Sequence, residues 1–117
     1  MSLFLGLDSS TQGLTAVIIS VSGTSRGVVW QHTINYDHDL PEYGTLHGVL
    51  QNPDPRIVRS SPAMWADALD RMMARIAIER SIDKSRIAAI TGAGQQHGSV
   101  YLSQDGLARL AAMDERT

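Results

Sequence analysis

A hydroxyl-rich turn, DSSTQG at residues 8–13, follows the first apolar run of the chain. Tight turns expose backbone N–H groups that form anion-binding concavities, and Ser10 and Thr11 add hydroxyl donors suited to phosphate oxygens. Asp8 would repel a bare phosphate, but its carboxylate can hold Mg²⁺ directly or through bound water. Because Asp, Ser, Thr and Gly are also common in ordinary Asx-type turns, the pattern alone leaves both interpretations open. A Walker loop is excluded, since the turn has no lysine and no helix is predicted after it.

A second turn places three polar side chains, Gln95, Gln96 and His97, between Gly94 and Gly98. One or two glycines satisfy the backbone of a turn, so adjacent side chains that donate and accept hydrogen bonds favour a ligand rich in hydroxyl groups. A purely structural histidine is the alternative interpretation. A metal site is not indicated, because no second histidine or carboxylate lies at ligand spacing nearby. A Ser-His-Asp hydrolase is not indicated either, because the chain has no nucleophile elbow.

Three successive strands are expected to position the first of these turns. The apolar or β-branched segments 3–7, 14–21 and 27–36 are separated by turn-forming residues at 8–13 and 22–27. Short turns between successive strands predict an antiparallel meander. The DSSTQG turn then joins its first two strands.

A long segment, residues 37–61, separates the meander from the clearest helix. It carries three prolines and two glycines. A loop of this length within a compact domain is uncommon and is often functional. A surface loop without a function is the alternative. Short strands within the segment are compatible with either interpretation.

The clearest helix is predicted to begin at Pro62, with Ser61 as its cap, and to continue through AMWADALDRMMARIAIER. Apolar side chains at helical spacing predict one core-facing stripe: Trp65, Leu69, Met72, Met73 and Ile76. Two pairs of opposite charge, four residues apart, are expected on the other face: Asp67 with Arg71, and Arg75 with Glu79. Trp65, near the helix start, is also suited to form the wall of a pocket.

Beyond the helix, the segment 81–86 predicts a turn, and the apolar run IAAIT at 87–91 predicts a strand. Uninterrupted apolar strands are typical of parallel sheets that are reached through a helical crossover and covered on both faces. A further short strand is expected at 99–102, a turn at 104–106, and a helix from Leu107.

These elements predict an α/β fold with a mixed sheet and one clear helix. One helix covers only one face of a sheet, and the first and fourth strands are apolar at nearly every position, so the other face also needs a cover. The chain is therefore expected to be the opening part of a larger domain. In isolation we expect it to associate with itself or to be poorly soluble, since the bare face would expose on the order of several hundred Å² of apolar surface.

Composition excludes several classes of protein. The chain has 117 residues, a net charge of −2 and a single lysine, Lys84, so a nucleic-acid-binding surface is not expected. It has no cysteine, which excludes disulfides and thiolate chemistry. The N-terminus lacks a basic region, and no apolar stretch approaches the roughly 20 residues that cross a bilayer. We expect a cytoplasmic protein without nucleic-acid or membrane partners.

Four stretches in the same order resemble the FGGY carbohydrate kinase family of the actin-like ATPase superfamily. They are LGLDSSTQGLTAVII, DLPEYGTLHGV, SPAMWADALD and GAGQQHGSVY, and the resemblance runs from about Leu3 to Leu102. The Gln-Gln-His turn is most similar to that of the xylulokinase branch of the family, in particular the longer type found in eukaryotes and some bacteria.

The resemblance implies a ribonuclease-H-like first domain whose opening hairpin approaches the phosphates of ATP. It also implies a role for each matching residue: Asp8 places Mg²⁺, Ser10, Thr11 and Gln12 face the γ-phosphate, and Gln96 and His97 bind the sugar. The implied reaction is phosphorylation of a ketopentose, most closely D-xylulose, by ATP.

Two departures from the family pattern affect this expectation. The family usually has Lys or Arg four residues after the threonine of the first turn, and this chain has Thr15 there. The second phosphate motif, the adenine pocket, the catalytic aspartate and the second domain of the family have no counterpart in residues 1–117. We therefore expect the chain to be the N-terminal part of the first kinase domain, with no catalytic base and no kinase activity of its own.

Two alternatives stay open at the level of sequence. One is another FGGY kinase, acting on ribulose, glycerol or gluconate. The other is an actin-like nucleotide-binding domain that performs no sugar chemistry.

Overall fold

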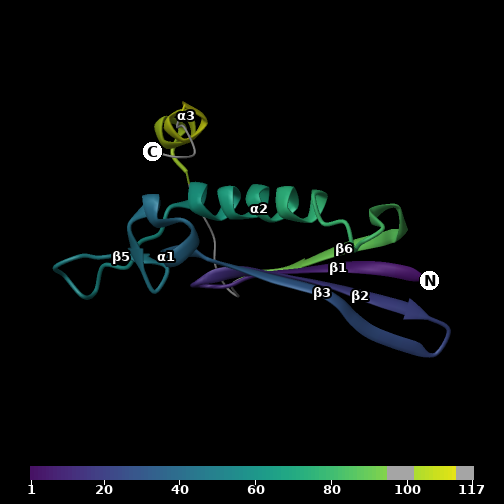
Figure 1. The fold of residues 1–117 in the computed structure, drawn as a ribbon. Coiled ribbons are helices and arrows are strands. Elements are labelled where there is room, and N and C mark those ends of the chain that lie inside the picture. The colour runs from purple at the N-terminus through teal and green to yellow at the C-terminus, as the bar shows by residue number, and fades with distance from the viewer. Residues whose placement is uncertain (95–101, 113–117) are drawn as a thin grey trace.

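A four-stranded mixed sheet forms the centre of the computed structural model, which describes residues 1–94 and 102–112 (Figure 1). The sheet has the strand order β3-β2-β1-β6. Its strands are β1 (Ser2–Ser9), β2 (Gly13–Ser22), β3 (Ser25–Asn35) and β6 (Ile87–Ala93). The helix α2 (Pro62–Ala77) runs along one face of the sheet, and the short helix η2 (Lys84–Arg86) leads from it into β6. The expected α/β class with a mixed sheet is confirmed.

The antiparallel meander of β1, β2 and β3 is also confirmed. β1 pairs with β2 up to Ser9↔Leu14, which makes the first turn short. The second turn is shorter than predicted, because Ser22 pairs with Ser25 and only Gly23 and Thr24 lie at its tip. Gly23 has a φ of +60°, and a glycine in this left-handed conformation allows a tight two-residue hairpin.

The segment after β3 is folded into short elements rather than an open loop. They are α1 (Tyr36–Asp39), η1 (Pro41–Tyr43), β4 (Thr45–Leu46) and β5 (Val49–Leu50). We call residues 36–60 the excursion. The Asn35 side chain accepts a hydrogen bond of 3.0 Å from His38 N and so caps α1, which moves Tyr36 out of the predicted third strand. Tyr36 and Leu40 are fully buried, so the excursion contributes to the core.

The predicted start of α2 at Pro62 is confirmed, although the Ser61 side chain makes no capping hydrogen bond and the helix ends at Ala77 rather than Arg80. The predicted core-facing stripe is partly wrong. The buried residues follow a single row with four-residue spacing and one flanking carboxylate: Met64, Ala68, Met72 and Ile76, with Asp67. Leu69 and Met73 are 42% and 40% exposed, because the apolar surface of α2 is wider than the strip that the sheet covers.

Asp67, expected on the solvent side of α2, is 5% exposed because η1 covers it. It accepts hydrogen bonds of 3.2 Å from the Tyr43 hydroxyl and from the predicted partner Arg71. Burial, followed by the Asp67 charge, raises the pKa of Tyr43 to about 12. Arg71 also pairs with Glu42 and donates to the Asp39 carbonyl, so this network fastens the excursion to α2.

The sheet face opposite α2 is open in the described part of the chain. On this face Val28 of β3, which pairs with the exposed Ile19 of β2, is 61% exposed. β6 pairs in parallel with β1, as the crossover predicted, but the expectation that this strand is covered on both faces is wrong, since its residues beyond Ile87 are exposed. Its position at the edge of the sheet explains the difference.

The last helix, α3 (Gln104–Ala112), begins three residues earlier than predicted. Ser103 Oγ accepts a hydrogen bond of 2.9 Å from Gly106 N, which places the expected turn inside the first helical turn. The strand expected at 99–102 lies outside the described residues except for Leu102. Among the described helices, none has the length and hydropathy needed to cross a membrane.

Candidate functional site

The two turns singled out in the sequence leave the sheet at the same edge. β1 and β6 are parallel neighbours, and Asp8 pairs with Ala93 in their register. The first turn therefore follows β1 at the point where Gly94 follows β6. Gly94 is the last described residue before the Gln-Gln-His segment, so Gln96 and His97 themselves lie outside the described residues. In open sheets with parallel strands, ligands bind outside the carboxyl ends of the strands.

The first turn is closed by its own hydrogen bonds. Ser10 N and Ser10 Oγ both donate to Gly13 O, at 2.9 and 3.1 Å. The Ser10 hydroxyl, expected to face a phosphate, thus donates within the turn. The Thr11 and Gln12 side chains are exposed. Within the part of the chain that the structure describes, neither Thr11 N–H nor Gln12 N–H donates a hydrogen bond, so the exposed turn offers two backbone donors to an anion.

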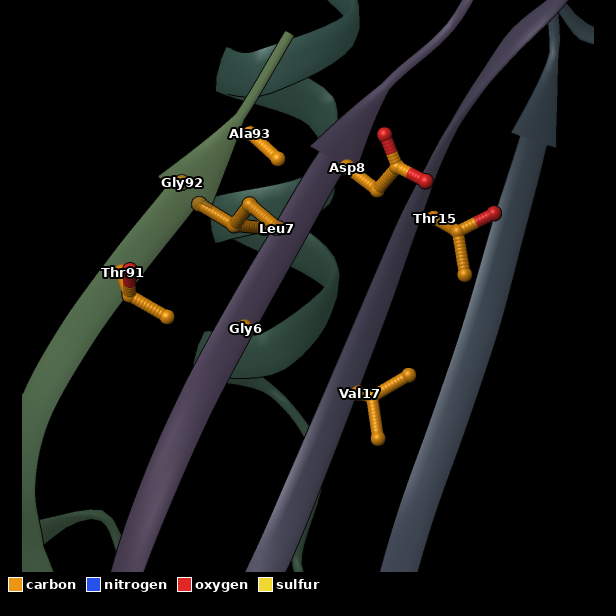
Figure 2. Close-up of a pocket in the computed structure, with 8 residues that line it drawn as sticks. All are labelled: Gly6, Leu7, Asp8, Thr15, Val17, Thr91, Gly92 and Ala93. Atoms are coloured by element: carbon orange, nitrogen blue, oxygen red, sulfur yellow. The ribbon is translucent and has the colours of Figure 1, made fainter.

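Asp8 lies on the open face of the sheet, beside Thr15 of β2 and away from α2 (Figure 2). It borders a shallow pocket of about 310 Å³. The pocket is lined by β1, β2 and β6: Gly6, Leu7, Asp8, Thr15, Val17, Thr91, Gly92 and Ala93. The exposed Asp8 carboxylate forms no hydrogen bond or ion pair with the described residues.

A Mg²⁺ ion at this edge would depend on Asp8 together with groups from elsewhere. The described residues bring together no three His, Asp or Glu side chains that could hold a metal. Mg²⁺ usually keeps several waters and is bound through one or two carboxylates plus the phosphates of a substrate. An unpartnered carboxylate next to a turn with unpaired N–H groups fits that mode of binding.

Thr15 occupies the position where the resembling family usually carries a cation. It pairs with Asp8 across β1 and β2, and its hydroxyl lies 3.0 Å from that of Thr33 on β3. A basic side chain at this position would lie next to the Asp8 carboxylate. Here the position carries a neutral hydroxyl instead.

A second pocket, of about 300 Å³, opens between the same edge and the start of α2. Its lining includes Ser9, Trp65, Leu69 and Gly94, so the prediction that Trp65 forms a pocket wall is confirmed. The indole Nε1 of Trp65 is buried and has no hydrogen-bond partner among the described residues. This pocket lies next to the segment that leads into Gln95.

The excursion packs against the first turn, a contact that was not predicted from the sequence. Tyr36 N donates to Gln12 O at 3.0 Å, and the Tyr36 hydroxyl lies 3.4 Å from Ser9 Oγ. Gly48 is buried against Thr11. The two closely spaced glycines of the long segment were the only sequence feature that pointed to such a contact. A glycine in the sequence does not indicate which residue it packs against.

Comparison with known proteins links the chain to xylulose kinases. It is 39% identical to the xylulose kinase of Schizosaccharomyces pombe over 115 residues, and 35% identical to xylulose kinase 2 of Arabidopsis thaliana over 117 residues. The mouse xylulose kinase is 39% identical over 97 residues, which cover 83% of this chain. The crystal structure of a xyloylose kinase from Brucella ovis superposes with a TM-score of 0.61 and 25% identity over 89% of the chain.

These relatives are much longer than the chain. It spans 20% of the S. pombe and A. thaliana proteins and 19% of the B. ovis chain. No model of a protein family matches it. The resemblance inferred from the four sequence motifs is confirmed by the relatives, which cover 98% of this chain in two cases.

Proposed function

From this similarity to xylulose kinases, we propose that the chain is part of an ATP-dependent sugar kinase and contributes to both its phosphate site and its sugar site. The observation that carries the proposal is the pairing of Asp8 with Ala93, since it brings the ends of β1 and β6 to one edge. A kinase needs its phosphoryl donor and acceptor side by side, and phosphoryl transfer depends largely on such positioning.

The proposed roles follow the two turns. Asp8 holds Mg²⁺ on the transferred phosphate, and the turn at Ser10, Thr11 and Gln12 binds phosphate oxygens, with its backbone N–H groups as donors. Gln96 and His97 bind the hydroxyls of the sugar, for which D-xylulose is the proposed substrate. The catalytic base and the adenine pocket are proposed to lie in a longer polypeptide, since the relatives are about five times the length of this chain.

A panel of acceptors tests the reaction. The longer polypeptide, with Mg²⁺ and ATP, should phosphorylate D-xylulose at a higher kcat/KM than ribulose, glycerol or gluconate. Preference for another of these acceptors would contradict D-xylulose as the substrate but would still support a sugar kinase. Nucleotide binding without any phosphorylation would contradict the kinase. The 117-residue chain alone is proposed to show no turnover and to self-associate, which light scattering measures.

The variant His97→Ala tests the sugar site. Loss of one or two hydrogen bonds, each contributing roughly 0.5–1.5 kcal/mol, should weaken D-xylulose binding about tenfold to a hundredfold. The affinity for ATP and the melting temperature should hardly change. His38→Ala is the matched control, because His38 is exposed and pairs with its neighbour Asp39 rather than with a residue of either turn. Unchanged sugar affinity with a large loss of stability would make His97 a structural residue.

A further inference from the structure

The excursion touches the first turn through a glycine that has no room for a side chain. A Cβ atom at Gly48 would overlap the carbonyl oxygen of Thr11 and lie 3.1 Å from Gln12 Cα. Gly48 also has a φ of +81°, which side chains rarely tolerate. The Gly48 backbone therefore packs directly against the Thr11–Gln12 peptide.

Asp37 holds Gly48 in this place. Its carboxylate accepts hydrogen bonds of 2.6 Å from Thr45 Oγ1, 2.6 Å from His47 N and 3.1 Å from Gly48 N. Ser60 Oγ donates to Gly48 O at 2.6 Å from the other side. His47 has a φ of +56°, a conformation that a non-glycine residue adopts only when its surroundings enforce it. The hydrogen bond from Thr45, followed by those from the two N–H groups, lowers the pKa of Asp37.

The position of Gly48 determines which way one peptide of the turn faces. In a trans peptide the carbonyl oxygen and the amide hydrogen of the next residue point in opposite directions. Since the Thr11 oxygen faces Gly48, the Gln12 N–H points away from the excursion. The hydrogen bond from Tyr36 N to Gln12 O fixes the next peptide from the same side.

We propose that the excursion orients the first turn for phosphate, with Asp37 and Gly48 as positioning residues that keep the Gln12 N–H directed at the nucleotide. Neither residue needs to touch the ligand, because each acts through the Thr11–Gln12 peptide. This inference rests on the proposed function, since it assigns the turn to the phosphates of ATP.

A pair of glycine variants in the longer kinase polypeptide tests the contact. Gly48→Ala should raise the KM for ATP about tenfold or more and leave the KM for D-xylulose within about twofold. Gly44→Ala is the matched control, because Gly44 lies in the same excursion with a φ of +67°, but a methyl group added to it would meet nothing within 4 Å. Both variants introduce left-handed strain, so a difference between them in the KM for ATP reports the contact with Thr11.

A carboxylate series tests Asp37 and remains informative if Gly48→Ala does not fold. Asp37→Ala should raise the KM for ATP, whereas Asp37→Asn should recover part of the loss, since its amide oxygen can still accept from Thr45 and Gly48. Asp54→Ala is the control, because the Asp54 carboxylate accepts its hydrogen bonds from Arg56 within its own turn. Binding of a non-hydrolysable Mg²⁺–ATP analogue, measured by calorimetry, should follow the same order.

The outcomes separate this inference from the function it rests on. A wild-type protein that binds the ATP analogue but phosphorylates no sugar refutes the proposed reaction, and the calorimetric order of the variants still decides the role of the excursion. Equal ATP affinity in Gly48→Ala and Gly44→Ala, or in Asp37→Ala and Asp54→Ala, overturns the inference. Equal changes in the KM for ATP and for sugar overturn it as well.

Discussion

The two hairpin turns of the meander have similar residues and different surroundings. The first, SSTQG after Asp8, is closed by Ser10 and contacted from the excursion by Tyr36 and Gly48. The second, SGTS at residues 22–25, is exposed, and a Cβ at Gly23 would meet nothing within 4 Å. Ser, Thr and Gly therefore form a tight turn in either place. What makes the first turn a candidate binding site is its contacts with residues that are distant in sequence.

The largest effect is expected from removing the charge of Asp8 beside the first turn. In the longer polypeptide that we propose to be a kinase, Asp8→Asn should lower kcat about a hundredfold, about 2.7 kcal/mol in transition-state stabilisation, because it would remove the charge proposed to hold Mg²⁺ on the transferred phosphate. The KM for sugar should stay within about twofold. Thr24→Ala, at the tip of the second turn, should leave kcat unchanged in the same steady-state assay. Full turnover of Asp8→Asn at saturating Mg²⁺ and ATP would show that Asp8 has no role in the reaction.

The next effect concerns stability. Gly13→Ala should destabilise the fold by about 1–3 kcal/mol, because the added methyl group would overlap the backbone carbonyl of Ile34. Gly27→Ala, beside the second turn, meets open space and should change stability by less than about 1 kcal/mol, in the stabilising direction. Urea unfolding of both variants measures the contrast. Equal stability of the two would show that the strands adjust freely around the first turn.

Low pH should weaken the contact that Glu79 makes with β3, the strand that follows the second turn. Glu79 accepts hydrogen bonds of 3.2 Å from Trp30 Nε1 on β3 and 2.9 Å from Arg75 on α2. Hydrogen bonds from Ser81 and then Arg75 lower the pKa of Glu79 from 4.5 to about 2. A depressed pKa means that this stabilisation is present above pH 4.5 and is lost as the pH falls towards about 2.

The variant Glu79→Gln tests that pH dependence. It should lower the melting temperature at neutral pH by a few degrees and reduce the further fall between pH 4.5 and about pH 2. Melting curves at several pH values measure both changes. An acid-induced fall as steep as that of the wild type would assign the pH dependence to other carboxylates.

The smallest effect is expected where the chain departs from the family pattern. Thr15→Lys places a cation next to Asp8 on the exposed face and should lower the KM for ATP about two- to fivefold, as expected for a surface charge worth about 0.4–1 kcal/mol. Thr15→Met removes the hydroxyl contact with Thr33 without adding charge, so it separates the two consequences of the change. The same KM for ATP in both variants would mean that charge at this position does not affect nucleotide binding.

Local patterns predicted the regular elements well. The apolar and β-branched runs located β1, β2 and β3, and Pro62 located the start of α2, because strand and helix-start preferences depend on near neighbours. The helical crossover before β6 predicted that this strand would join a parallel sheet, and it does so beside β1. The sequence did not identify β1 as the partner of β6, so the meeting of Asp8 with Ala93 emerged only from the structure.

Contacts between distant residues could not be predicted in the same way. The buried row of α2 depends on where the sheet and η1 lie, and for this reason Leu69 is exposed while Asp67 is buried. The support of the first turn depends on Gly48, which is far from Thr11 in sequence. The roles expected for Gln96 and His97 stay predictions, because these residues lie outside the described part of the chain.

The parallel pairing of β1 with β6 also has a consequence for the order in which the chain folds. The hairpins of the meander close over a few residues, whereas Asp8 and Ala93 must meet across about 85 residues of chain. Contacts so far apart in sequence are entropically costly to close and form slowly. We expect the meander to form first and β6 to dock late, as the chain emerges during synthesis. Until β6 docks, the two turns have no common edge, so a nascent chain would lack the proposed joint site for nucleotide and sugar.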